Sequence, residues 1–126
     1  MAKYVHSDVL DGGLNAIKNN ASRMLLLKAY SFADSHATVT ANAICTVAMA
    51  PGDYALSGAD GAARILTVAA RSGTASANSG ATPDLHIAFT DNVNKVLLVT
   101  DETTDQVVTS GNTVNFPSLT YTSSQP

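Results

Sequence analysis

The side chains best suited to chemistry are three histidines, one cysteine and a short acidic run, and they are spread along the chain. His6, His36 and His86 lie far apart, and none belongs to a metal-binding spacing such as HxxxH, HExxH or CxxC. His86 alternates with Leu85 and Ile87 in a strand-like run, so we expect a solvated surface histidine there. The histidines therefore predict no catalytic or metal centre.

The remaining reactive groups give the same result. Cys45 lies in an apolar, β-branched run with no cation nearby to lower its pKa, so it is expected to be a buried structural thiol. Asp101, Glu102 and Asp105 lack the alternating oxygen ligands and the glycine of an EF-hand, so we expect a solvated acidic turn. No nucleophile, base and orienting group occur together. The sequence predicts a protein that is not an enzyme and needs no cofactor or metal.

Composition narrows the class further. The 126 residues suffice for one domain, and 45% are hydrophobic whereas only 13% are charged. The net charge is −3 and the seven Lys and Arg are scattered, so a basic face for nucleic acid is not expected. The longest apolar stretch, Met24–Leu27, is far too short to cross a membrane, and the N-terminus lacks the apolar region of a signal peptide. We expect a protein that is made and kept in a cytoplasm, or assembled there.

One helix is expected, near the N-terminus between Asp8 and Asn20. Ser7 or Asp8 could cap it, and three apolar residues recur on one face: Leu10, Leu14 and Ile17. Gly12 and Gly13 weaken its first turns, so we expect regular helix chiefly from Leu14.

From Arg23 onward the chain consists of short β-like runs separated by turn residues. Residues 23–30 are apolar enough for a strand buried on both faces, residues 37–42 favour a short turn or helix, and residues 72–83 read as a loop or a flat edge strand. A hairpin is expected around Gly58–Gly61, and another joining residues 107–110 to 113–116. The other expected strands cover residues 43–49, 54–57, 64–70, 85–90, 95–100 and 119–122.

These patterns predict a mainly-β chain: a β-sandwich or barrel-like domain of six to eight short antiparallel strands with one short N-terminal helix. Residues 1–22 would form an N-terminal segment and residues 23–126 the β domain. The core is expected to contain Leu25, Leu27, Ile44, Val47, Ile65, Val68, Leu85, Ile87, Phe89, Val96, Leu98 and Val114.

Two stretches together carry a resemblance to a known group of proteins. They are the opening, with MAKYVHSDVLDGGL and IKNN over residues 1–14 and 17–20, and the ending, with VTDETTD and GNTVNFP over residues 99–105 and 111–117. They resemble small virion structural proteins of tailed bacteriophages, over nearly the whole chain. The N-terminal helix departs from the best-known capsid decoration proteins of such phages.

The resemblance implies a capsid decoration (cement) protein, a class of small β-rich domains that often trimerise and lock the shell from outside. The implied partners are the major capsid protein and further copies of the chain, with a homotrimer expected. The implied location is the capsid exterior of the virion, assembled in the bacterial host cytoplasm. The alternative is a tail- or fibre-associated protein that contacts the tail or the host surface. A carbohydrate-binding module is disfavoured because the chain has no Trp and four Tyr.

Residues 1–20 are the first candidate for a segment that docks on the capsid, and Ser118–Pro126 the second. The candidate docking side chains are the apolar residues of the first segment: Tyr4, Val5, Leu10, Leu14 and Ile17. The competing interpretation is that the helix simply packs on its own sheet, and the sequence leaves both open.

Overall fold

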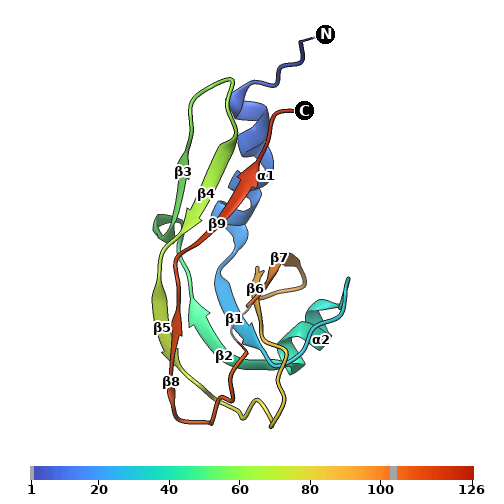
Figure 1. Cartoon of the computed structure of the whole chain (residues 1–126), viewed down its shortest axis with the longest axis vertical. Coiled ribbons are helices and arrows are strands. Elements are labelled where there is room, and N and C mark those ends of the chain that lie inside the picture. The colour runs from blue at the N-terminus through green and yellow to red at the C-terminus, as the bar shows by residue number, and fades with distance from the viewer. Residues whose placement is uncertain (1, 103–104) are drawn as a thin grey trace.

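The protein is mainly β, as the sequence predicts, and β-sandwich-like (Figure 1). The computed structural model describes residues 2–102 and 105–126, and within them there are nine strands and two α-helices. The helices are α1 (Ser7–Asn20) and α2 (His36–Ala41), and a 3-10 turn, η1, covers Pro51–Asp53. The strands are β1 (Arg23–Leu27), β2 (Ala43–Ala48), β3 (Tyr54–Ser57), β4 (Arg64–Val68), β5 (Arg71–Thr74), β6 (His86–Thr90), β7 (Val96–Asp101), β8 (Thr113–Phe116) and β9 (Leu119–Ser123).

The strands form three antiparallel sheets with the orders β2-β1-β6-β7, β3-β4-β9 and β5-β8. Figure 1 shows an elongated molecule in which α1 lies beside β3, β4 and β9 at one end, while α2 and the four-stranded sheet occupy the other. The hairpin predicted around Gly58–Gly61 joins β3 to β4. Gly58 has φ +111°, and a Cβ there would collide with the carbonyl oxygen of Ala63, so glycine is required.

Strand β1 is buried on both faces, as predicted. Met24 and Leu26 belong to the main core, whereas Leu25 and Leu27 join a second apolar cluster with Val39 of α2. The strand ends at Leu27 and not at residue 30, because the chain turns there. The Lys28 N–H still donates to the Asn42 carbonyl at 3.1 Å, and the Lys28 carbonyl accepts the Asp84 N–H at 3.2 Å, but the chain bends at Lys28 and leaves the sheet.

A long antiparallel ribbon joins the two ends of the molecule. Strand β5 follows β4 after two residues, and β9 follows β8 after two residues; β4 pairs with β9 and β5 pairs with β8. In the half of the ribbon formed by β5 and β8, strand β5 lies against β2. A Cβ on Gly73 of β5 would come within 3.0 Å of both Cys45 Sγ and Val47 Cγ2. Glycine permits this close approach.

The predicted hairpin between residues 107–110 and 113–116 is wrong. Residues 107–110 form no strand, and β8 pairs with β5, which lies at the start of the stretch expected to be a loop or an edge strand. Val108 is instead held by Ser79: its N–H donates to Ser79 Oγ at 2.8 Å, and its carbonyl accepts the Ser79 N–H at 2.9 Å. Long-range hydrogen bonds to the loop after β5 replace the local hairpin.

Most of the predicted core is confirmed. The buried members are Leu25, Leu27, Ile44, Val47, Val68, Leu85, Ile87 and Phe89, whereas Ile65, Val96, Leu98 and Val114 are only half-buried. Ile65 was assigned to the wrong face, because side chains alternate along β4 and the buried pair is Leu66 and Val68. Val96 and Leu98 lie on β7, at the edge of its sheet.

Helix α1 begins at Ser7 and runs through both glycines, earlier than expected. Its cap is the side chain of His6, whose Nδ1 accepts the Asp8 N–H at 3.0 Å. The predicted cap at Ser7 or Asp8 is wrong, because the chain is already helical there. The backbone N–H of Ser7 donates to Asp60 Oδ1 at 3.0 Å.

Replacing Phe89 by alanine is expected to destabilise the protein by about 3–5 kcal/mol, because a large ring in a closed core leaves a cavity. Phe89 is 0% exposed and meets the ring of Tyr54 edge-on, with 6.3 Å between ring centroids. The free energy of unfolding from urea titration measures the loss. The exposed Val93 is the control, and Val93→Ala should stay within about 0.5 kcal/mol. A loss below about 1 kcal/mol for Phe89→Ala would contradict the assignment.

Candidate functional site

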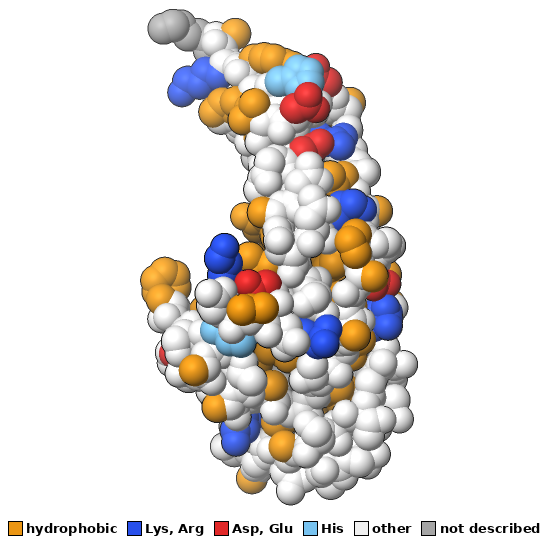
Figure 2. Space-filling view, turned by 180° about the vertical axis from the view of Figure 1, so that it is seen from behind, with side chains coloured by type: hydrophobic (Ala, Val, Ile, Leu, Met, Phe, Trp, Pro, Cys, Tyr) orange, Lys and Arg blue, Asp and Glu red, His pale blue; other side chains and the backbone are white. Residues whose placement is uncertain are grey.

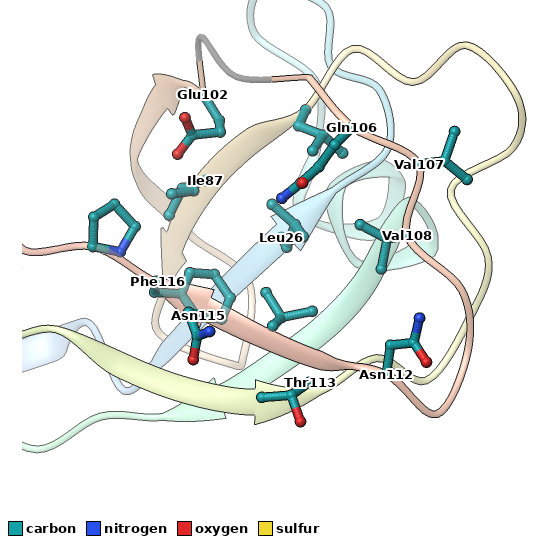
Figure 3. A pocket seen from close by; sticks show the side chains of 13 residues that line it. Leu26, Ile87, Glu102, Gln106, Val107, Val108, Asn112, Thr113, Asn115 and Phe116 are labelled. Carbon is teal, nitrogen blue, oxygen red and sulfur yellow. The ribbon is translucent and has the colours of Figure 1, made fainter.

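A pocket of about 470 Å³ lies between β8 and the segment of residues 105–112 that precedes it (Figure 3). Residues from β1, β6, β8, that segment and positions next to β6, β7 and β8 surround it: Leu26, Leu85, Ile87, Glu102, Gln106, Val107, Val108, Asn112, Thr113, Val114, Asn115, Phe116 and Pro117. In Figure 3, Glu102 and Gln106 lie on one side of the hollow, and Asn112 and Thr113 on the opposite side.

The pocket has an apolar interior and a polar rim that carries amide groups and one carboxylate, that of Glu102. Leu85, Ile87 and Phe116 are buried in the main core, whereas Gln106 and Asn115 are exposed. Among the thirteen lining residues Glu102 alone is ionisable, and there is no His, Cys, Ser or Lys. Such a lining suits recognition of an apolar group with amide hydrogen bonds at its edge.

The segment that walls the pocket is fixed by hydrogen bonds from distant loops. Asp105 Oδ1 accepts the Leu85 N–H at 2.7 Å, and Asn78 Oδ1 accepts the Ser110 N–H at 2.8 Å. The expected acidic turn at residues 101–105 falls partly outside the described residues; Asp101 closes β7 and Asp105 anchors the segment. The small, polar stretch after β5 thus serves as a platform for the pocket wall, which sequence patterns did not indicate.

The expectation for His86 is wrong: the side chain is only 15% exposed and packs against Tyr30, with 5.5 Å between ring centroids. Its Nδ1 lies 3.1 Å from the Asp84 carbonyl oxygen, which can only accept, so this hydrogen bond forms when Nδ1 is protonated. Its Nε2 lies 3.8 Å from Asp101 Oδ1. Asp84, His86 and Asp101 are, in the described part of the chain, the one group whose ligand atoms all lie within 4.8 Å, and both carboxylates are exposed. The contacts orient the imidazole ring.

Cys45 is buried, as predicted. It is 0% exposed in the main core, and burial raises the pKa of its thiol. A thiol kept protonated and out of contact with solvent is a poor nucleophile.

The structure separates the candidate docking residues into two groups. Leu10, Leu14 and Ile17 are buried, and Leu14 and Ile17 share the main core with the strands, so these three do not form an exposed docking face. The helix packs on β3, β4 and β9. Tyr4 is exposed and Val5 half-buried.

The segment before α1 is attached to the rest of the chain at two points. The Val5 N–H donates to Gln125 Oε1 at 2.8 Å, and Gln125 Nε2 donates back to the Val5 carbonyl at 2.7 Å. The Tyr4 hydroxyl donates to the Asp60 carboxylate at 2.8 Å. Hydrogen bonds from Tyr4 and from the Ser7 N–H lower the pKa of Asp60, and the same contact raises the pKa of Tyr4. The two candidate docking segments therefore contact each other.

Comparison of the chain with protein-family models, curated proteins and solved structures gives no match. Among the described residues, no helix combines the length and apolar character needed to cross a bilayer.

Replacing Leu14 by alanine distinguishes a core helix from a separable arm. Leu14 is 0% exposed, so Leu14→Ala should cost about 2–5 kcal/mol of unfolding free energy. Val9, on the same helix but 68% exposed, is the matched control, and Val9→Ala should change stability by less than about 0.5 kcal/mol. Removal of residues 1–20 should likewise unfold the domain. Equal stability of Leu14→Ala and the parent in urea titration would restore the arm hypothesis.

The Asp60 contacts predict a pH-dependent N-terminal segment. Because the folded pKa lies below the unfolded value of about 4, the stabilisation is complete above pH 4 and is lost as pH falls through the folded pKa. The hydrogen-exchange protection factor of the Ser7 amide should fall as the pH is lowered through the folded pKa of Asp60. In Asp60→Ala it should be low already at pH 6, whereas Asp84→Ala, which removes another exposed carboxylate, should match the parent. Equal protection in Asp60→Ala and the parent at pH 6 would refute this role.

Proposed function

We propose that this protein is a non-enzymatic structural protein of a tailed-phage virion that binds the outside of the capsid shell and stabilises it as a decoration protein. The proposal joins the resemblance of residues 1–20 and 99–117 to phage virion proteins with the character of the molecular surface. Its partners would be the major capsid protein and further copies of the same chain.

The surface is the observation that carries the proposal. Among the described residues, six large hydrophobic side chains are at least 45% exposed, and no two of them are neighbours in the sequence. They are Tyr4, Val9, Phe32, Val93, Val107 and Tyr121. Charged residues make up only 13% of the chain. Figure 2 shows one face, largely white with scattered apolar side chains and few charges. Such a surface suits a protein covered by neighbours, because few long charged side chains must be ordered when contacts form.

Open sheet edges support the same conclusion. Strands β7 and β9 each lie at the edge of their sheets. An exposed strand edge presents unpaired backbone groups and invites uncontrolled pairing, so proteins usually cover it. Assembly on a regular shell would provide that cover. The pocket beside β8 adds a site for an apolar group of a partner.

Phage particles made without this protein should lose their DNA at a lower temperature than complete particles. Adding the purified protein back should restore the release temperature, because each copy would bridge neighbouring capsid subunits. Dye-detected DNA release during heating measures the effect, and an unrelated protein of similar size serves as the control.

Cryo-electron microscopy of the same particles locates the protein. The proposal expects extra density on the capsid exterior in complete particles only. Density confined to the tail or fibres would instead establish the alternative, a tail- or fibre-associated protein. Unchanged release temperature together with an unchanged capsid would overturn the decoration function.

A further inference from the structure

We propose that copies of this protein join by inserting Phe32 of one copy into the apolar groove between β7 and β9 of a second copy. This deepens the proposed function by naming the contact between copies on which the expected trimer would rest.

Phe32 is presented on a fixed turn. Its side chain is 98% exposed, in the segment between β1 and α2, which projects from the body of the molecule (Figure 1). The Asp34 N–H donates to the Ser31 carbonyl at 3.0 Å, and the Ser31 N–H donates to Asp34 Oδ2 at 2.9 Å. Ala33 between them has φ +64°, which a non-glycine residue seldom adopts. Because the turn is already ordered, burial of the ring would lose little backbone entropy.

The receiving groove is a hollow of about 200 Å³ where the edges of two sheets meet. Its lining contains no charged residue: Val68, Phe89, Leu98, Val99, Thr100, Leu119, Thr120 and Tyr121. Leu98 and Leu119 pack on the main core but are only half-buried, so the core is incomplete at this point. Apolar cavities of about 150 Å³ hold a benzene molecule, so this hollow has room for one phenyl ring.

The occupant can be chosen among the exposed aromatic side chains of the protein itself. The described residues offer three, namely Tyr4, Phe32 and Tyr121. Tyr4 is already hydrogen-bonded to Asp60, and Tyr121 belongs to the groove lining itself. Phe32 is therefore the side chain of the three that is free to enter the groove of another copy. An uncharged ring matches an uncharged lining, whereas a charged or strongly polar group would lose its hydration there.

The contact would be heterologous, because the two surfaces involved are different. Each copy would donate its Phe32 to one neighbour and receive the Phe32 of another, and such contacts form a ring when the rotation closes. A ring of three would agree with the trimer expected from the resemblance. Every exposed Phe32 and every groove would then be covered.

The first experiment compares self-association of the purified protein with that of Phe32→Ala, by sedimentation equilibrium from about 1 µM to 1 mM. The parent should associate, and Phe32→Ala should weaken association at least 30-fold, the effect typical of an aromatic hot spot. Val93→Ala removes another exposed apolar side chain from a turn and should associate like the parent. Because Phe32 has almost no contacts, its replacement should leave thermal stability unchanged.

The second experiment blocks the groove and then mixes the variants. Thr120 is an exposed residue of the lining, and Thr120→Arg places a charged side chain at the opening. It should weaken association at least as strongly as Phe32→Ala does. A mixture of the two should form one-to-one dimers and nothing larger, because the Phe32 of one variant still fits the intact groove of the other. A contact between identical surfaces would not give this complementation.

Three results would overturn the proposal: a parent protein that is monomeric up to 1 mM, association unaffected by Phe32→Ala, or a mixture that remains monomeric. Capsids take no part in these measurements. If these association experiments fail, the proposal that the protein binds the capsid is unaffected. If the protein does not bind capsids, the proposed contact between copies is unaffected.

Discussion

One antiparallel ribbon runs the length of the molecule and changes its packing partner half way along. Its β4–β9 half covers α1, and its β5–β8 half lies against the four-stranded sheet. Hydrogen bonds fix the joint: Ala69 N–H donates to the Asp53 carbonyl, and Ser118 Oγ donates to the Val68 carbonyl, both at 2.8 Å. The Asp53 carboxylate also accepts from Arg71 at 2.9 Å. The helix, the pocket and the groove all depend on this ribbon, because each is built against one of its strands.

Sequence patterns predict those elements whose burial or helical periodicity is visible within their own residues. The five residues of β1 are apolar enough to be buried on both faces, and Leu10, Leu14 and Ile17 have the spacing of one helix face. The patterns failed where the partner is distant. Gly111 and Asn112 favour a local turn, yet β8 pairs with β5, whose small and polar residues show no apolar alternation.

The candidate site was harder to predict from sequence than the fold. The pocket wall depends on Ser79 and Asn78, whose side chains bind backbone groups about thirty residues away, and no local pattern reports such bonds. The apolar face of α1 was recognisable, but spacing alone does not say whether a helix packs on its own sheet or on another protein. The exposure of Phe32 likewise follows from the turn at Ser31–Asp34 and not from its residue type.

The pairing of β4 with β9 also governs how the chain reaches this structure. Strand β4 is complete only when it pairs with β9, residues 119–123, which lie far along the chain. Strand β1 likewise depends on pairing with the distant β6. Closing such long loops precedes the contacts that reward it, so chains dominated by distant strand pairs fold slowly, in milliseconds to seconds. During that interval β4, which carries Leu66 and Val68, has an open edge toward other unfolded chains. Refolding at high protein concentration is therefore expected to be sensitive to how late β9 pairs with β4.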